Sequence, residues 1–386
     1  MRIKKSGDFL KTTPAYQVDG GALHYLVRNV YKLPLNSLSP LHSLPEGSQS
    51  STDTMALAEE SRCKAMVNVL AQPEIKIEIR QGGHPGPLTV SSVLIKNDRD
   101  VAQIVELQKG RSSLTARLFE SIDHYGAYFA AQHTTPVNSA PANLLKLTLS
   151  LEVLVFMFNL IDCYRRAYLY EMLDHSTNLV EAIYEDEFVS TLQQALKSND
   201  LRWAVPSLLR LVPGLSNSVL EFQSEYLNIA EHLQLFARTV AGESGRRLFC
   251  LGSTGKYLGM EFALSWKQAS GLEVTLLNNQ GQVVSVGRYY LASTDEANHW
   301  ISLTQLPSKT EFTHLSLTQS ETVDEIKNIL RKHLSILGEK QKKSDAEVIH
   351  KYCIKCGCKL NAGALFCSQC GTKINRDGPS PAMDDL

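Results

Sequence analysis

The fold class is decided by residues 247–291, RLFCLGSTGKYLGMEFALSWKQASGLEVTLLNNQGQVVSVGRYYL. Short runs rich in β-branched and aromatic side chains alternate here with clusters of Gly, Ser and Asn, a pattern typical of an antiparallel β-meander. The cluster Gly252-Ser253-Thr254-Gly255-Lys256 lacks the residue spacing of a phosphate-binding loop and lies between predicted strands, so we interpret it as a hairpin turn. We predict strands at residues 247–251, 257–266, 272–277, 283–291 and 312–317.

Helices are predicted on both sides of this meander. The most apolar stretch, residues 147–161, is too short to span a membrane and contains Glu152. We therefore predict a core helix that is buried nearly all round and continues to Leu173. An amphipathic helix follows the meander at residues 322–337 and ends at Gly338.

The first third of the chain shows a similar order of elements. A helix is predicted from Asp53 to Ala71, followed by strands at residues 75–80 and 88–95 and by a helix at 114–129. A helix followed by strands is also predicted in residues 221–291. An internal duplication is therefore a hypothesis, although no fixed-period sequence match supports it.

These patterns predict an α+β fold, helical segments with an antiparallel β-meander, and a small C-terminal appendage. Subdomains at residues 51–140 and 141–338 are an open alternative within one body, and residues 339–350 form either a solvated linker or a helical spacer. The predicted parts are an irregular arm at 1–50, a body at 51–338, a charged linker at 339–350, a zinc ribbon at 351–375 and a disordered tail at 376–386.

The composition restricts function and location. A chain of 386 residues with 43% hydrophobic and 20% charged residues is typical of a globular protein with two or three domains. Because the net charge is −1, any contact with nucleic acid or an anionic membrane has to be local. Cys63, Cys163 and Cys250 are scattered and no signal peptide opens the chain, so we expect a reducing cytoplasm.

Two Cys-x-x-Cys pairs near the end of the chain predict one structural zinc ion. Each pair places two thiolates at adjacent corners of a tetrahedron, and a glycine follows each second cysteine. The shell has no open position, so the predicted zinc is structural and not catalytic. The predicted ligands are Cys353, Cys356, Cys367 and Cys370.

The run from Tyr352 to Ile374 resembles, position for position, the zinc-ribbon module common at the ends of bacterial and archaeal proteins. Leu360, Phe366 and Ile374 fall where that family places a minimal apolar core. The resemblance covers only residues 351–375 and implies a prokaryotic protein. Cys358 departs from the family's pattern, since its thiol either competes for zinc or stays free.

The ribbon is locally basic. Cationic side chains release counterions from phosphate, so contact with nucleic acid is one interpretation, and a solvated surface or an acidic protein partner is the other. The residues concerned are Lys351, Lys355, Lys359, Lys373 and Arg376.

No catalytic motif was found in the sequence. The acidic group Glu181, Glu185, Asp186 and Glu187 is compatible with a cation site but equally with a solvated helix face. No histidine pairs with another at helical spacing, which favours surface or core roles. The histidines considered are His84, His124, His133, His175, His232, His299, His314, His333 and His350.

These observations favour a binding protein over an enzyme. The order of helices and strands in the body is similar to that of cytosolic chaperones of type VII secretion substrates. We therefore expect a cytoplasmic, chaperone-like adaptor that binds a protein partner with its body and uses the ribbon as a second contact. The alternatives are a regulator that contacts nucleic acid through the ribbon, and an enzyme whose catalytic residues are scattered along the chain.

Overall fold

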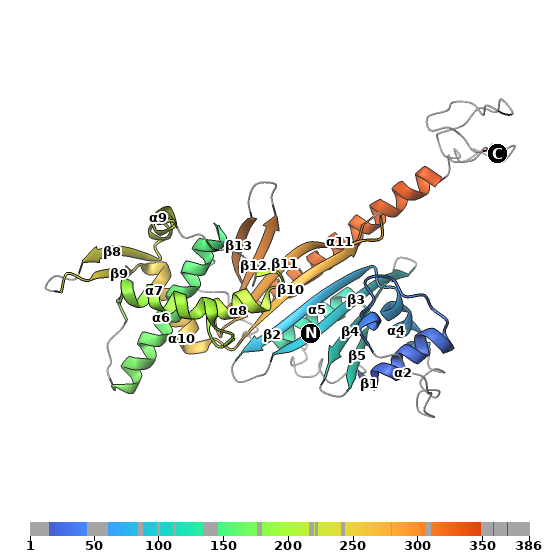
Figure 1. The fold of residues 1–386 in the computed structure, drawn as a ribbon, viewed down its shortest axis with the longest axis horizontal. Coiled ribbons are helices and arrows are strands. Elements are labelled where there is room, and N and C mark those ends of the chain that lie inside the picture. Colours follow the sequence, from blue (N-terminus) through green and yellow to red (C-terminus); the bar gives the residue numbers. More distant parts are fainter. Residues whose placement is uncertain are drawn as a thin grey trace, which may run out of the picture. The chain divides into compact units, whose positions relative to one another are not determined.

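The structure is a computed structural model (Figure 1). By its contacts the chain divides into two compact units, residues 1–329 and residues 330–386. The elements and sites described below belong to the first unit, except that α11 runs on past it. The structure describes residues 15–44, 61–83, 88–98, 101–110, 113–133, 146–175, 180–215, 220, 223–240, 244–278, 280–305, 310–348, 358 and 369.

The α+β class is confirmed by an antiparallel sheet of ten strands in the order β1-β5-β4-β3-β2-β10-β11-β12-β13-β6. Its first half contains β1 (Ala15–Val18), β2 (Ile75–Gly83), β3 (Thr89–Asp98), β4 (Val101–Lys109) and β5 (Leu114–Phe119). Its second half contains β6 (Lys146–Leu149), β10 (Gln268–Leu277), β11 (Val283–Ser293), β12 (Asn298–Gln305) and β13 (Thr310–Leu317).

The two halves repeat one order of elements. Each begins with an edge strand and a helix, and continues with a second helix, a four-stranded meander and a third helix. The halves join where β2 pairs with β10, and Ile79 faces Leu272 at the centre of that pair. The repeat of topology agrees with the duplication hypothesis, but the helix of the second copy begins at Ser253 and not near residue 221. The helices are α2 (Gly20–Tyr25), α4 (Ser61–Ala71) and α5 (Ile122–Gln132) in the first half, and α6 (Leu151–Leu173), α10 (Ser253–Ser265) and α11 (Gln319–Val348) in the second.

Each half has its own apolar core. In the first half, α2 and α4 pack on β3, β4 and β5. In the second half, α6 is the centre of the core, and its residues from Val153 to Tyr164 are all buried. The N-cap Ser150 accepts a hydrogen bond from the Val153 amide at 3.3 Å, which starts the helix directly after β6. The predicted core helix is therefore confirmed over this range.

An additional segment separates α6 from α10 in the second half (Figure 1). It occupies residues 174–252, whereas residues 26–60 separate α2 from α4 in the first half. Its elements are α7 (Glu185–Lys197), α8 (Ala204–Leu211), α9 (Ser224–His232) and a three-stranded sheet in the order β7 (Ala182–Tyr184), β9 (Arg247–Leu251), β8 (Phe236–Val240). We call residues 174–252 the inserted segment.

Several predicted elements were wrong. Residues 257–265 of the predicted strand belong to helix α10, and residues 114–129 contain β5 and the first part of α5. Strand β12 was missed, and α11 continues past Gly338 to Val348. The supposed irregular arm contributes β1 to the sheet and α2 to the first core, where Leu23 and Val27 are fully buried.

Among the helices of the described residues, none is both long and apolar enough to cross a bilayer.

Candidate protein-binding site

The C-terminal end of α6 carries a cluster of exposed apolar side chains. The same helix is buried from Val153 to Tyr164, so its character changes from core to surface within one continuous element. Surface apolar residues are ordinary when single, but a cluster marks a binding site or an aggregation hazard. We call the cluster the α6 tip; it consists of Leu169, Tyr170, Met172 and Leu173, which are 52%, 61%, 56% and 65% exposed.

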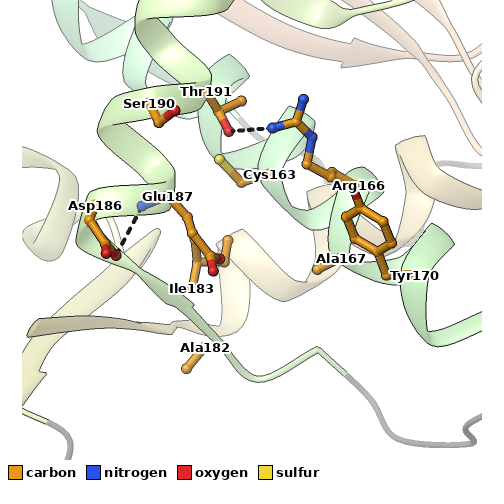
Figure 2. Close-up of a pocket in the computed structure, with 10 residues that line it drawn as sticks. All are labelled: Cys163, Arg166, Ala167, Tyr170, Ala182, Ile183, Asp186, Glu187, Ser190 and Thr191. Carbon is orange, nitrogen blue, oxygen red and sulfur yellow. Dashed lines mark hydrogen bonds between the residues drawn. The ribbon is translucent and has the colours of Figure 1, made fainter. Parts of the chain in front are cut away.

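A cavity of about 430 Å³ adjoins the α6 tip (Figure 2). Tyr170 belongs to both the tip and the cavity wall, so the two surfaces are continuous. The volume is within the range typical of sites that take a ligand or an anchoring side chain. The lining residues are Cys163, Arg166, Ala167 and Tyr170 from α6, Ala182 and Ile183 from β7, and Asp186, Glu187, Ser190 and Thr191 from α7.

The walls of the cavity are held by polar contacts between α6 and α7. Arg166 donates hydrogen bonds at 3.3 Å to Thr191 Oγ1, which Figure 2 shows, and to Gln194 Oε1. Cys163 is buried in the wall, and burial raises the pKa of its thiol to about 12. A thiol of that pKa is neutral at pH 7 and is neither a good nucleophile nor a metal ligand. Cys163 is therefore a packing residue of the cavity wall.

A second hollow lies on the other side of α7, with a volume of about 500 Å³. Asp186 and Ser190 line both hollows, so α7 forms a ridge between them. Val189, which is half exposed, lies on that ridge beside the second hollow. Another chain can pack against this ridge and place side chains in the two hollows beside it.

The predicted acidic group lies around the start of α7 and is neutralised by nearby arginines and lysine. Arg246 donates to both carboxylate oxygens of Asp186 at 2.7 and 2.8 Å, and this contact holds the pKa of Asp186 below its usual range. Glu185 pairs with Arg247 at 2.9 Å, and Lys256 pairs with Glu181 at 3.2 Å. Acidic side chains at a helix N-terminus are also favoured by the helix dipole. The group is therefore a solvated helix start and shows no cation site.

Helix α6 fixes the inserted segment through a buried carboxylate. Asp162 accepts hydrogen bonds from the amides of Ala204 at 2.7 Å and Val205 at 3.0 Å, which are the first two residues of α8. The residue at the N-cap position of α8, Trp203, contributes no side-chain cap of its own. Asp162 is thus an N-cap supplied by another helix, and it satisfies two amides that α8 cannot satisfy itself.

Arg165 locks the same junction from the next turn of α6. Its guanidinium lies 5.2 Å from the Trp203 ring and 4.6 Å from the Trp266 ring, and it donates to the Arg202 carbonyl at 2.8 Å. Cation–π contacts of this kind stabilise by about 1 kcal/mol each when partly buried. The junction of α6 with α8 and α10 is therefore rigid, and it supports the α6 tip two turns further on.

The sequence Gly252-Ser253-Thr254-Gly255-Lys256 starts helix α10 and does not form the predicted hairpin turn. The Gly252 amide donates to the Leu235 carbonyl at 3.1 Å, and the Gly255 amide donates to the Gln234 carbonyl at 3.3 Å. A Cβ atom on Gly255 would lie 2.0 Å from the Leu235 carbonyl oxygen, so only glycine fits there. Both amides are already used by backbone carbonyls, so neither is available to a phosphate.

The predicted zinc ligands Cys353, Cys356, Cys367 and Cys370 lie outside the described residues, as do the five basic residues of the ribbon. Within the described part of the chain, no group of three or more His, Cys, Asp or Glu side chains could hold a metal ion.

Sequence reasoning missed the α6 tip, Asp162 and a buried pair of histidines. The structure brings His299 and His314 together, with Nδ1 of the first 3.1 Å from Nε2 of the second. The signal that could have found this pair is the register of the β12–β13 hairpin, which places His314 opposite Ile301 and His299 opposite Ser316. That register could not be used because β12 was not predicted.

Comparisons with known proteins identify no family. No family model matches the chain, and no curated protein matches it. Among solved structures, the type VII secretion system chaperone EspG5 of Mycobacterium tuberculosis, solved in complex with the PE25–PPE41 dimer, is similar with a TM-score of 0.42 and 7% identity. The match covers 82% of this chain and 96% of that chain. Likeness at this level is too low to assign a function, which is therefore inferred from this chain's own residues.

Proposed function

We propose that the protein is a non-enzymatic, chaperone-like adaptor that binds an amphipathic segment of a protein partner at the α6 tip and its cavity. The observation that carries the proposal is the contiguity of four exposed apolar side chains with a cavity of about 430 Å³. The cavity walls come from α6 and the inserted segment, which lengthens one half of an otherwise repeated scaffold. Binding sites are commonly carried by such additions to a rigid frame.

The α6 tip could supply a useful part of a binding free energy. Complete burial of a Leu, Met or aromatic side chain stabilises by about 1.5–3 kcal/mol, so covering four half-exposed ones contributes roughly 4 kcal/mol before the costs of association. The cavity can take one anchoring side chain of the partner beside the tip. The tip and the cavity together therefore favour binding of a partner segment with an apolar face over binding of an extended polar peptide.

The surroundings of the tip are acidic. Glu171 lies on the last turn of α6 and Asp174 is its C-cap residue. A partner segment that carries lysine or arginine beside its apolar residues would complement these carboxylates. We therefore infer an amphipathic segment with a basic border.

The test compares two exposed leucines of equal accessibility. Leu173 is 65% exposed in the α6 tip and Leu264 is 61% exposed on α10, so Leu173→Asp and Leu264→Asp are matched changes. Wild type and both variants are purified from the organism that encodes the protein, and the recovered partner is then titrated against each by calorimetry. We expect Leu173→Asp to weaken binding at least 100-fold and Leu264→Asp to leave it unchanged. Equal affinities of all three proteins would overturn the proposal.

The zinc ribbon remains part of the proposal. The spacing of Cys353, Cys356, Cys367 and Cys370 and the resemblance to the prokaryotic module support one structural zinc ion. A ribbon in a reducing cytoplasm would serve as the second contact of the adaptor. Removing residues after Gly338 separates partners held by the ribbon from partners held by the body.

Contact with nucleic acid through the ribbon is the second candidate. It is supported by five Lys and Arg residues in residues 351–376 with no Asp or Glu among them. Binding of labelled DNA or RNA should then weaken steeply as salt rises, because each neutralised phosphate releases counterions. An absence of binding at low salt eliminates this candidate.

A further inference from the structure

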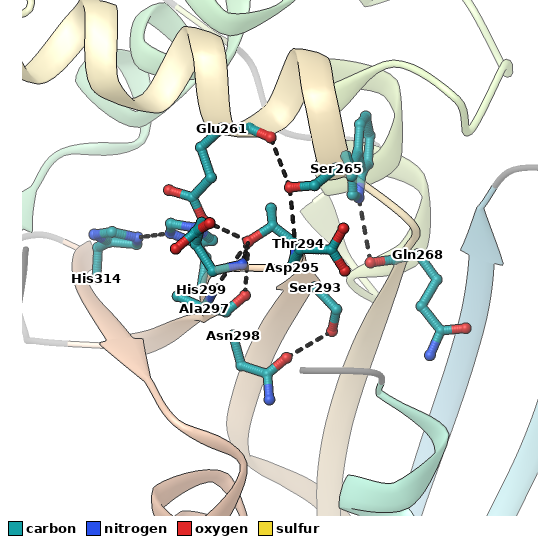
Figure 3. Close-up of polar contacts among 12 residues, drawn as sticks. Glu261, Ser265, Gln268, Ser293, Thr294, Asp295, Ala297, Asn298, His299 and His314 are labelled. Atoms are coloured by element: carbon teal, nitrogen blue, oxygen red, sulfur yellow. Dashed lines mark hydrogen bonds and ion pairs between the residues drawn. The ribbon is translucent and has the colours of Figure 1, made fainter. Parts of the chain in front are cut away.

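Buried polar side chains gather at the turn between β11 and β12 (Figure 3). Four polar side chains in and beside this turn are buried, and their two hydrogen-bond chains reach α5, α10, α11, β10 and β13. We call Ser293, Thr294, Asn298 and His299 the polar turn. Buried polar networks are costly when any member loses its partner, so such a turn is sensitive to a change of protonation.

The first chain runs from the polar turn to the start of α11, and its direction is fixed by its end. Thr322 donates to the Thr318 carbonyl at 2.8 Å, so its oxygen accepts from Asn298 Nδ2 at 2.9 Å. The Oδ1 atom of Asn298 then faces Ser293 and accepts its hydroxyl hydrogen at 2.8 Å. The Ser293 hydroxyl has only one hydrogen to donate, and this hydrogen-bond chain uses it.

The direction of the first chain fixes the tautomer of His133, the residue that ends α5. Since the hydroxyl hydrogen of Ser293 is committed to Asn298, the 2.8 Å contact with His133 requires an N–H on Nδ1 of the histidine, and the longer 3.3 Å contact of Gln268 Nε2 with the same Nδ1 is then not a hydrogen bond. The Nε2 atom of His133 is then an acceptor, and Ser270 donates to it at 3.1 Å. His133 is neutral in this arrangement, and burial lowers the pKa of its imidazole to about 3.

The second chain runs from the polar turn to α10 and β13. His299 Nε2 lies 2.7 Å from Glu261 Oε1, and Thr294 donates to the same carboxylate oxygen. With Nε2 of a neutral His299 donating to the carboxylate, Nδ1 accepts from His314 Nε2. The Nδ1 atom of His314 then has no partner among the described residues, and neither do Glu261 Oε2 and Ser316 Oγ.

The groups around the second chain disfavour a positive charge on His314. Burial raises the pKa of Glu261, but its hydrogen bonds and attraction to His299 outweigh burial and hold that pKa below the usual value. His314 is stacked on His299 with ring centroids 5.3 Å apart, and burial together with His299 lowers its pKa to about 3. Tyr257 is the other group beside Glu261, and Glu296 lies beyond it.

We propose that the polar turn is an acid-operated latch that holds α5 and the first turn of α11 on the sheet and releases them when His133 and His314 take up protons. A proton on His133 Nε2 ends its role as an acceptor for Ser270 and places a cation among the Ser270 and Ser293 hydroxyls, the Gln268 amide and the Phe129 ring, with no carboxylate among these contacts. A proton on His314 Nδ1 places a cation beside His299, on the side away from Glu261. Both hydrogen-bond chains then break at the polar turn. Strands β1 to β5 contribute no residue to either of them.

The latch is tested by hydrogen exchange of the full chain between pH 7 and pH 4, with each protection factor corrected for the pH dependence of chemical exchange. Peptides from α5, the polar turn and the first turn of α11 report on the latch, and peptides from α4 and β3 are the reference. We expect latch protection to fall relative to the reference by about tenfold per pH unit below pH 6 for each proton taken up on opening. A ratio that stays constant from pH 7 to pH 4 overturns the proposal.

Substitutions of the two histidines identify the groups whose protonation opens the latch. His133→Gln and His314→Gln remove the titrating rings, and the double variant is expected to make the protection ratio independent of pH. His232→Gln changes an exposed histidine on α9 and is expected to keep the wild-type slope. If the double variant does not fold, histidine NMR of the wild type decides. Proton uptake at His133 and His314 that coincides with loss of latch protection supports the latch, and opening without that uptake refutes it.

Discussion

Replacing Asp162 with its neutral isostere gives a pH-dependent test of the junction that positions the α6 tip. Asp162 is fully buried, and burial raises the pKa of its carboxyl to about 6 from an ordinary value of 3.8, against the lowering effects of the two α8 amides and Arg165. The folded protein therefore binds more protons than the unfolded chain between these two pH values. The stabilisation from this group is fully present below pH 3.8 and is lost as the pH rises through 6.

The size of the effect follows from the two pKa values. A difference of roughly two pKa units corresponds to about 3 kcal/mol of unfolding free energy, at 1.4 kcal/mol per unit. Asp162→Asn abolishes this pH dependence but loses one acceptor for the α8 amides, which costs about 1–3 kcal/mol at every pH. We therefore expect Asp162→Asn to cost about 1–3 kcal/mol at low pH, and to be neutral or stabilising by up to about 2 kcal/mol at pH 7.

The assay is urea unfolding of wild type and Asp162→Asn at pH 4, 5, 6 and 7. Asp200→Asn is the matched control, because contact with Arg202 lowers the pKa of Asp200 and gives the opposite sign. Its stabilisation is present above the unfolded pKa and is lost as the pH falls, so the cost of Asp200→Asn should grow with pH. A cost of Asp162→Asn that is constant, or that grows with pH, refutes the reasoning.

Three further predictions concern other parts of the chain. Gly255→Ala should cost about 3 kcal/mol or more because its Cβ meets the Leu235 carbonyl oxygen at 2.0 Å. Gly245→Ala is the control, because nothing lies within 4 Å of its Cβ and only its φ of +64° is unfavourable; it should cost about 1–2 kcal/mol. Both costs are measured by thermal unfolding, and equal costs would contradict the close approach at Gly255. Arg165→Lys should cost about 1–2 kcal/mol and shift tryptophan fluorescence, because the guanidinium contacts Trp203 and Trp266; an unchanged spectrum and unchanged unfolding argue against that lock. Native mass spectrometry should find one zinc ion per chain and none in Cys370→Ser, whose ribbon should become protease-sensitive while the body remains folded, and a ribbon equally resistant without zinc would be the contrary result.

The parts of the fold that were predicted from sequence are those whose pattern is set by one face of one element. Ile75, Ile77 and Ile79 are buried and alternate with half-buried polar residues, so the period of two identified β2 directly. The core helix was found because residues 153–164 are apolar at nearly every position. Both patterns are local, and local patterns are visible without knowledge of partners.

Helix α10 was predicted as a strand because its sequence is short, apolar and bordered by glycines, as a buried strand would be. Its structure depends on Gly252 and Gly255 packing against the chain at Gln234 and Leu235, a contact between distant residues that no local pattern reveals. Strand β12 contains Asn298 and His299, which are polar yet fully buried. Their partners lie on α10, β11, β13 and α11, so the strand did not show the expected alternation of apolar and polar residues.

The candidate site was not predictable for a similar reason. The apolar residues at the end of α6 continue the pattern of its buried part, so their sequence gives no sign that they are exposed. Exposure depends on which elements pack on a helix, and that depends on the inserted segment. The cap from Asp162 to α8 likewise joins residues that are 42 positions apart.

The central claim is that the α6 tip contacts a protein partner in the cell, and site-specific photo-crosslinking tests it most directly. A photoreactive amino acid is placed at Leu173 in one strain and at Leu264 in another, since both positions are exposed to a similar degree. Our account predicts one discrete adduct with the same partner that binds the purified protein, formed from position 173 and not from position 264. No adduct at position 173, or the same adduct from both positions, would contradict it.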